Sequence, residues 1–311
     1  MITVVSMNPC IDLTLFIPKL EIGGSHRVTR TRSDISGKAV NVAHCLKNLE
    51  QPSKLLGFNF IENGNLLEES LDKSQITHDL LTLNGSIRTN IKIFEEKSEN
   101  MTEINQESAF VSENDLQKLL EKIKLATSKV VILSGSLPTG AKSQAYGDII
   151  RQTTSPTILD TYGAALLDGL SAGAYIIKPN LFELEQTLQA KLSTEKEQIL
   201  AVKSLLQKYP KTRAVCLSLG AKGAFMISQT EVFFAPPLKI PIKGVQGAGD
   251  SLVAGSALIL ANNANATLAE MLKSATAAAT ASLMQEGSLM CTKQDYINML
   301  KKVDILDYSN Q

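Results

Sequence analysis

The sequence predicts an α/β protein with a doubly wound, mostly parallel sheet flanked by helices, together with a small separate β-sheet. Two observations lead to this prediction. After residue 110, short apolar runs alternate with helical segments, which is typical of parallel strands joined by crossover helices. Before residue 110, two segments instead alternate polar and apolar residues, the pattern of half-exposed antiparallel strands.

The amino-terminal third is expected to supply one buried strand, the small sheet and two helices. Residues 2–6 form a short β-branched run that suits a buried strand. The alternating pattern covers residues 12–36 and 86–109. Helical patterns lie between them, at 39–49 and 66–74.

The rest of the chain is expected to form strand–helix repeats. Buried-strand candidates lie at residues 130–133, 157–159, 175–177 and 214–217. Helices are expected near 113–127, 143–152, 182–190 and 194–208, from 252 to 261, and over the alanine-rich segment 275–281. No internal repeat or low-complexity linker divides the chain, so we expect one domain over residues 1–311.

Composition argues against several classes of protein. The chain has 31 basic and 31 acidic residues, so its charge favours neither nucleic acid nor a membrane surface as a partner. No apolar stretch reaches the roughly 18 residues of a membrane span, and the start is too short for a signal peptide, so we expect a cytoplasmic protein. Four cysteines are scattered along the sequence and are expected to be reduced core residues: Cys10, Cys45, Cys216 and Cys291.

Residues 243–255, Lys-Gly-Val-Gln-Gly-Ala-Gly-Asp-Ser-Leu-Val-Ala-Gly, are the most informative stretch. Glycines let backbone N–H groups approach a ligand, and the start of the following helix adds unpaired donors and partial positive charge, which suits a phosphate. Asp250 lies in the middle of this stretch. A carboxylate beside an anion site needs a task, and the obvious one is to accept a proton from a hydroxyl that attacks phosphorus.

Two alternatives for this stretch can be weighed on the residues. It is neither a P-loop nor a dinucleotide loop, because Asp250 replaces the required lysine and Leu252 replaces the third glycine. It could instead be a plain glycine-rich turn in which Asp250 caps the helix.

The stretch resembles the Gly-Ala-Gly-Asp signature of the phosphofructokinase B (ribokinase-like) family of sugar kinases, in particular the 1-phosphofructokinase and tagatose-6-phosphate kinase branch. Other segments match the family in the same order, and together the matches span residues 8 to 291. These segments are Asn8–Asp12, Ser36–Ala43, Ser134–Pro138 with Gly140, Leu159–Thr161 with Gly163, Lys178–Asn180 with Glu183, and Ser218–Gly223.

The resemblance implies an ATP-dependent kinase that phosphorylates a phosphorylated ketohexose to a bisphosphate. The acceptor would be fructose 1-phosphate or tagatose 6-phosphate; the alternatives are a free sugar or nucleoside, or a sugar-phosphate sensor without activity. ATP and Mg²⁺ are the implied cofactors. The segments at about 12–36 and 86–109 would form a lid over the sugar, and a homodimer through the lids is one way to cover their exposed edges.

The resemblance also implies roles for individual residues at the site of transfer. Asp250 would be the catalytic base, and the backbone N–H groups of Gly247, Ala248 and Gly249 would stabilise charge on the transferred phosphoryl group.

Substrate contacts are implied for six residues. Asp12 would bind sugar hydroxyls, although it could simply end the first strand. Basic residues would hold the phosphate already on the substrate, although each could belong to a solvated basic face. The residues lining the sugar are Asp12, Gly37 and Asn41, and those for its phosphate are Lys38, Arg27 and Arg88.

Nucleotide and metal contacts are implied at the ends of two later strands. Asn180 and Glu183 would organise Mg²⁺, often through water, although the same spacing suits a helix-capping pair. The nucleotide would contact Asn180 and Gly249 and the turn that holds Ser218, Gly220 and Gly223, although that turn could be a plain β-turn.

The first family signature departs from its usual form at two positions. Ser36 and Ala39 replace glycines. If those glycines adopt positive φ, a residue with a β-carbon would be strained there. Lid closure or substrate preference would then differ from the family norm.

Overall fold

The computed structural model describes residues 1–309 and has the predicted α/β fold, with a large sheet and a small one. The large sheet has the strand order β14-β13-β12-β11-β10-β9-β8-β1-β4-β5. Neighbours from β5 to β11 pair in parallel, and those from β11 to β14 are antiparallel. In chain order these strands are β1 (Ile2–Ser6), β4 (Ser53–Glu62), β5 (His78–Ser86), β8 (Val130–Ser134), β9 (Thr157–Asp160), β10 (Ile176–Ile177), β11 (Ala214–Ser218), β12 (Ala224–Ile227), β13 (Val232–Ala235) and β14 (Leu306–Asp307).

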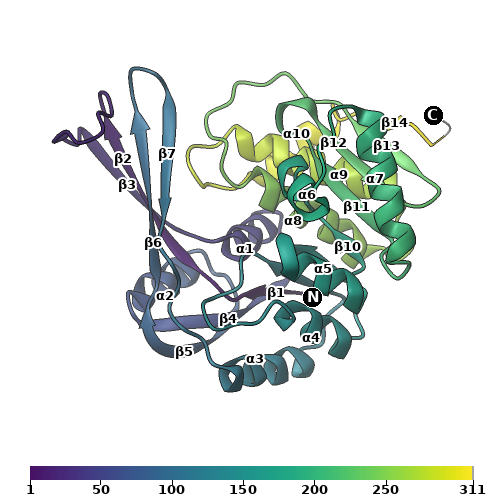
Figure 1. Cartoon of the computed structure of the whole chain (residues 1–311), viewed down its shortest axis with the longest axis horizontal. Coiled ribbons are helices and arrows are strands. Elements are labelled where there is room, and N and C mark those ends of the chain that lie inside the picture. Colours follow the sequence, from purple (N-terminus) through teal and green to yellow (C-terminus); the bar gives the residue numbers. More distant parts are fainter. Residues whose placement is uncertain (310–311) are drawn as a thin grey trace.

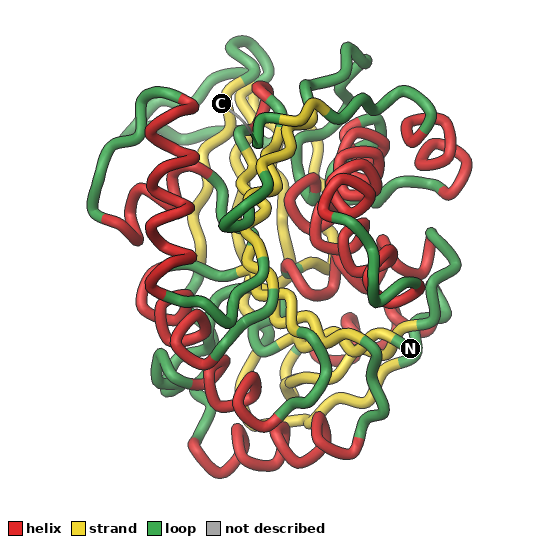
Figure 2. The backbone as a smooth tube through the Cα atoms, turned by 90° about the vertical axis from the view of Figure 1, so that its right-hand side faces the viewer, coloured by secondary structure: helices red, strands yellow, loops and turns green. Residues whose placement is uncertain are grey.

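Helices lie on both faces of the large sheet (Figure 2), as a doubly wound fold requires. They are α1 (Lys38–Asn48), α2 (Gly64–Lys73), α3 (Glu113–Leu125), α4 (Ala145–Gln152), α5 (Gly163–Ala172), α6 (Leu181–Leu188), α7 (Glu195–Lys208), α8 (Ala248–Asn262), α9 (Leu268–Leu283) and α10 (Lys293–Leu300). Every predicted helix is present, and α5 and α10 were not predicted. Within residues 1–309, no helix has both the length and the apolar character that crossing a bilayer demands.

The small sheet projects from one side of the body (Figure 1) and contains β2 (Cys10–Ile17), β3 (Arg30–Ser36), β6 (Arg88–Glu95) and β7 (Asn100–Asn105) in the order β3-β2-β6-β7. Its outer pairs are antiparallel as predicted, but the central pair β2–β6 is parallel. The reason is topological. β2 directly follows β1 and β6 directly follows β5, and β1 and β5 run in the same direction in the large sheet.

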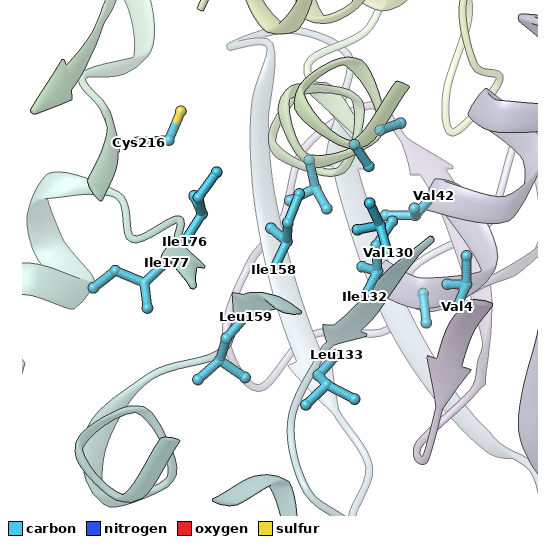
Figure 3. Close-up of a cluster of buried hydrophobic side chains, with 14 of the residues drawn as sticks. Val4, Val42, Val130, Ile132, Leu133, Ile158, Leu159, Ile176, Ile177 and Cys216 are labelled. Atoms are coloured by element: carbon cyan, nitrogen blue, oxygen red, sulfur yellow. The ribbon is translucent and has the colours of Figure 1, made fainter. Parts of the chain in front are cut away.

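Aliphatic side chains of the central strands form the core. Val4, Ile132, Ile158 and Ile176 are almost fully buried, and Figure 3 shows them in a row across the neighbouring strands β1, β8, β9 and β10. Burying such a side chain contributes about 1.5–3 kcal/mol relative to leaving it exposed. The alanine-rich segment is buried within α9, which packs against α8. This packing fixes the position of α8, whose first turn borders the candidate site.

All four cysteines are free and buried, in agreement with the predicted reduced core residues. They are not all far apart in space. The sulfur atoms of Cys45 in α1 and Cys291, just before α10, are 3.7 Å apart. The fold therefore brings together two thiols that the sequence separates.

Candidate active site

Most of the predicted site residues line one cavity of about 460 Å³. Its walls come from the small sheet, from the start of α1, and from segments that follow strands of the large sheet at their carboxyl ends. Ligands bind at this edge of doubly wound sheets in general. The predicted residues that line it are Asp12, Gly37, Lys38, Asn41, Arg88, Asn180, Glu183, Ser218, Gly247, Gly249 and Asp250.

Asp250 is the third residue of α8, and its side chain faces the cavity. Gly247, not Asp250, is the N-cap of the helix and has a left-handed conformation with φ +74°. Asp250 is only 6% exposed, and its Oδ2 accepts a hydrogen bond from Nδ2 of Asn41 at 2.8 Å. The structure thus excludes Asp250 as the helix cap, and its carboxylate is available to a ligand in the cavity.

The environment of Asp250 favours a proton acceptor near neutral pH. Burial, with the nearby negative charge of Asp160, raises the pKa of Asp250 to about 6. The hydrogen bond from Asn41 and the charges of Lys38 and Lys178 act in the opposite direction. A carboxylate with this pKa is mostly ionised at pH 7 yet basic enough to accept a proton.

Lys38 begins α1, and two carboxylates already neutralise its ammonium group. Its Nζ lies 3.1 Å from Oδ1 of Asp160 and 3.3 Å from Oε1 of Glu183. Although burial opposes the charge, these carboxylates hold the pKa of Lys38 above its ordinary value. Lys38 is therefore a weaker candidate for the phosphate of the sugar than the sequence indicates.

Asp12 lies in β2 and is held by two donors from β6. Its Oδ2 accepts from Nζ of Lys92 at 2.8 Å, and its Oδ1 accepts from Nδ2 of Asn90 at 3.0 Å. Although burial opposes ionisation, these hydrogen bonds hold the pKa of Asp12 below its ordinary value. Asp12 is in the cavity as an ionised acceptor, not merely as the end of a strand.

Arg88 also lies in the cavity, and its charge has no carboxylate partner among the described residues. Nη1 donates to Oδ1 of Asn90 at 3.2 Å and to the carbonyl of Gln106 at 3.5 Å. Nε is buried without a hydrogen-bond partner in the described part of the chain. Since an unsatisfied buried donor is costly, this guanidinium suits an anionic ligand.

Arg27 does not join these residues. It is exposed in the segment between β2 and β3 and is not among the residues lining the cavity. The alternating pattern of residues 12–36 predicts strands, but it does not show that Arg27 lies in the connection between two of them, outside the cavity.

Asn180 and Glu183 form the predicted alternative, a capping box at the start of α6. Oδ1 of Asn180 accepts from the Glu183 N–H at 2.7 Å, and Oε2 of Glu183 accepts from the Asn180 N–H at 2.8 Å. Oε1 of Glu183 faces Lys38. Residues 1–309 contain no group of three or more His, Cys, Asp or Glu side chains arranged for a metal. This donor set does not fit a Mg²⁺ ion bound by the protein alone.

The predicted nucleotide turn lies beside the cavity. Ser218 ends β11 and lines the cavity, whereas Gly220, Gly223 and Ala248 do not. Gly220 begins a 3₁₀ turn, Gly220–Lys222, and a β-carbon built on it would meet no atom within 4 Å. The turn is therefore open to a ligand on that side.

The departures at Ser36 and Ala39 cause no strain. Neither residue has a positive φ; the left-handed conformation falls on Gly37, with φ +120°. A β-carbon on Gly37 would also lie 3.2 Å from Cα of Pro9. The signature therefore needs glycine at this one position of the three.

Several residues of the site were not predicted. Asn90 and Lys92 follow Arg88 at every second position of β6, so strand periodicity could have placed them on the same face. Asp160 and Lys178 lie in segments that resemble the family, but no role had been inferred for them. Glu103, Asn105 and Gln246 also line the cavity, and no role was inferred for them although Gln246 lies within the stretch 243–255.

Comparisons with known proteins agree with this geometry. Residues 2–295 match the pfkB family of carbohydrate kinases. The chain is 32% identical to a 1-phosphofructokinase of Borreliella burgdorferi over 311 residues, 99% of each chain, and 28% identical to the Escherichia coli enzyme of that name over 315 residues, also 99% of each. The crystal structure of phosphofructokinase-2 from Escherichia coli with substrates and products has the same fold, with a TM-score of 0.89, 24% identity, and coverage of 97% of this chain and 98% of that one.

Proposed function

Because the chain belongs to the pfkB family of carbohydrate kinases, we propose that it transfers the γ-phosphoryl group of ATP to fructose 1-phosphate and forms fructose 1,6-bisphosphate. The proposal rests on one observation. The buried carboxylate of Asp250, in the first turn of α8, shares a single cavity with Arg88 and with Asp12 and its partners Asn90 and Lys92. The names of the similar 1-phosphofructokinases support this choice of acceptor.

Asp250 activates the acceptor. As the 6-hydroxyl oxygen of the sugar attacks the γ-phosphorus, its proton passes to the Asp250 carboxylate, and the bond from phosphorus to the ADP oxygen breaks. A positioned base of this kind contributes about 10²–10⁴-fold to the rate. Asn41 orients the carboxylate through the hydrogen bond to Oδ2.

Backbone donors at the start of α8 stabilise the transferred group. The N–H groups of Gly247, Ala248 and Gly249 lie at the positive end of the helix dipole, where negative charge accumulates during transfer. Loss of one such donor in an enzyme costs about 10²–10³-fold in rate. Mg²⁺ would neutralise phosphate oxygens when it is bound with ATP, and Glu183 and Asn180 would approach it through water.

The small sheet recognises the sugar. Asp12 accepts hydrogen bonds from sugar hydroxyls, and a sugar that lacks one would leave a buried acceptor unpaired. Arg88 binds the phosphate at carbon 1 through the guanidinium nitrogens that have no carboxylate partner. The nucleotide lies near Ser218 and the open turn at Gly220, and the small sheet covers the sugar as a lid.

A homodimer through the lids is part of this proposal. Every residue of the edge strand β7 is exposed, and an exposed edge strand favours pairing with another chain. Light scattering would detect the dimer, and a charge placed at Ile104, which is 54% exposed on β7, should weaken it. A monomer at micromolar concentration would contradict this part.

A coupled assay of ADP release over a panel of acceptors tests the proposed reaction. The panel contains fructose 1-phosphate, tagatose 6-phosphate, fructose 6-phosphate, and free fructose and ribose. We expect the highest kcat/KM with fructose 1-phosphate. A preference for tagatose 6-phosphate would mean that this sugar, and not fructose 1-phosphate, is the substrate. A preference for a free sugar would contradict the proposed contact between Arg88 and a sugar phosphate. No turnover with any acceptor would favour a sensor without activity.

A further inference from the structure

Cys45 and Cys291 form a pair of buried thiols that the proposed reaction does not use. Their sulfur atoms lie 3.7 Å apart and share a hydrogen bond, and neither residue is exposed. Cys45 lies in α1, and Cys291 lies in the segment between α9 and α10. An S–S bond is about 2.0 Å long, so an approach of about 1.7 Å would join two residues that are 246 apart in the sequence.

The two thiols differ in acidity. The hydrogen bond from the Cys45 thiol holds the pKa of Cys291 below its ordinary value, whereas the same hydrogen bond, together with burial, raises the pKa of Cys45. The thiolate is the form of cysteine that attacks an oxidant. Cys291 is therefore the better nucleophile of the pair, and Cys45 is the thiol within reach of the oxidised sulfur.

A second cavity, of about 650 Å³, gives a small molecule a route toward the pair. It is lined by residues of α1, α2 and β3 and by the segment before α10, including Asn48 and Met290. Asn48 also donates hydrogen bonds to the carbonyl oxygens of Met290 and Cys291, at 3.4 and 3.1 Å. A peroxide that enters this cavity reaches the thiols once this segment shifts, so their oxidation should be slower than that of an exposed side chain.

Cys45 is connected to the candidate active site through α1. It lies one helical turn after Asn41, so the two side chains share one side of the helix. Asn41 lines both the second cavity and the candidate site, and its Nδ2 donates to Oδ2 of Asp250 at 2.8 Å. Since α1 also packs against α8, a shift of α1 at Cys45 would displace the group that orients the carboxylate of Asp250.

Cys291 is connected to the same turn of α8 by hydrogen bonds. Its backbone N–H donates to Oγ of Ser282 in α9 at 2.9 Å. Oγ of Ser282 lies 2.7 Å from Oγ of Ser251, the residue directly after Asp250. The two thiols therefore contact the first turn of α8 through different neighbours, and a movement that joins them would act on this turn from both sides.

We propose that Cys45 and Cys291 are a modification site, at which a peroxide closes a reversible disulfide that lowers turnover at the candidate active site. The Cys291 thiolate attacks one peroxide oxygen, the O–O bond breaks, and the other oxygen takes up a proton and leaves as water. The Cys45 sulfur then attacks the sulfenic acid, the S–O bond breaks, and a second water leaves with the Cys45 proton. Each sulfur gives up one electron to the peroxide. The disulfide does not depend on the proposed function, whereas its effect on turnover does.

Peptide mapping tests the modification itself. The reduced wild-type protein is treated with hydrogen peroxide, its free thiols are blocked, and a protease digest is analysed without reductant. We expect a linked peptide that contains residues 45 and 291 and that dithiothreitol separates. Cys216→Ala removes a buried thiol outside the pair, so this control should give the same linked peptide. Absence of the linked peptide after the exposed Met101 has become a sulfoxide would overturn the proposal.

The rate of ADP release with fructose 1-phosphate tests the effect on the site. We expect oxidation to lower kcat of the wild-type protein about 10- to 100-fold, because a displacement of about 1 Å near a reacting group can cost about 10²-fold. Dithiothreitol should restore the rate, which distinguishes the disulfide from a sulfoxide at Met290. Cys45→Ala should keep its rate in peroxide, and Cys216→Ala should remain sensitive. If Cys45→Ala does not fold, Cys291→Ala replaces it.

The outcomes separate this inference from the proposed function. A linked peptide with an unchanged kcat would overturn the effect on the site. An equal and reversible loss of kcat in a folded Cys45→Ala or Cys291→Ala variant would also overturn it. No turnover by the reduced wild-type protein with any sugar phosphate would overturn the proposed function together with the effect on turnover, and the linked peptide would still show whether the disulfide forms.

Discussion

The two sheets contribute differently to the cavity. The central strands β1, β8 and β9 of the large sheet are buried along their whole length, whereas β7 of the small sheet is exposed along its whole length. The segment after β10 of the large sheet supplies Lys178 to the cavity, and α8 supplies Asp250. The small sheet supplies Asp12, Lys92 and Arg88. Under the proposed function, the large sheet and α8 support the chemistry, and the small sheet recognises the sugar.

The ion pairs of the two sheets also differ. In the small sheet, one carboxylate (Asp12) meets one ammonium group (Lys92) in a neutral pair, and Arg88 of the same sheet has no carboxylate partner in the described part of the chain. At the large sheet, Asp160 contacts the ammonium groups of both Lys38 and Lys178, and Glu183 also contacts Lys38, so two carboxylates meet two ammonium groups. The positive charge left for the phosphate of the sugar is therefore that of Arg88.

Breaking the neutral pair should have the largest effect on stability. Lys92→Met leaves the buried carboxylate of Asp12 without its cation, and loss of one partner of a buried pair costs about 3–5 kcal/mol. Chemical denaturation should show this decrease in the free energy of unfolding. Lys19→Met, which breaks an exposed pair with Glu21, is the control and should change it little. A neutral effect of Lys92→Met would mean that the pair is solvated.

Removal of Arg88 should affect recognition and leave the chemistry intact. A hydrogen bond to a charged group contributes about 1.5–3 kcal/mol, so Arg88→Met should raise KM for fructose 1-phosphate roughly 10- to 100-fold. KM for ATP and the kcat at saturation should change little. Steady-state kinetics with both substrates varied would check this, and an equal loss in both KM values would contradict the division between the sheets.

Asp250 should set the acid side of the pH profile. The pKa of Asp250 is about 6, and the base must be ionised to act, so kcat/KM should fall as the pH drops below about 6 and level off above it. Asn41→Ala removes a hydrogen bond that lowers this pKa, so the fall should begin at a higher pH. An unchanged profile in Asn41→Ala would show that another group controls it.

Much of the fold was predictable because its signals are local. Most of the buried β-branched runs and the helices between them appear in the structure within a few residues of their predicted limits, but α9 begins at Leu268, well before the predicted segment 275–281. The strands β4, β5, β12, β13 and β14 were missed. Gly57 and Asn59 interrupt the apolar pattern of β4, and β5 is an edge strand with mixed burial, so neither shows a clear period. Glycines likewise weaken the helical pattern of α5.

The site was predictable only where short segments carry it. Asp250 and its glycines are adjacent in sequence, so their chemistry could be inferred from the residues themselves. The ion pairs could not be inferred, because Asp12 and Lys92 are 80 residues apart and Lys38 and Asp160 are 122 apart. Such pairs depend on which strands lie side by side, and no local pattern encodes this. The expected role of Lys38 at the phosphate of the sugar is weakened because its ammonium group is paired with two such distant carboxylates, Asp160 and Glu183.

The turnover of Asp250→Asn with ATP and fructose 1-phosphate tests the central claim most directly, because asparagine keeps the shape of the side chain and cannot accept the proton. We expect kcat to fall about 10²–10⁴-fold while the variant still binds both substrates. Asp148→Asn, on the exposed surface of α4, is the control and should keep the wild-type rate. A folded Asp250→Asn protein with the wild-type kcat would contradict the account.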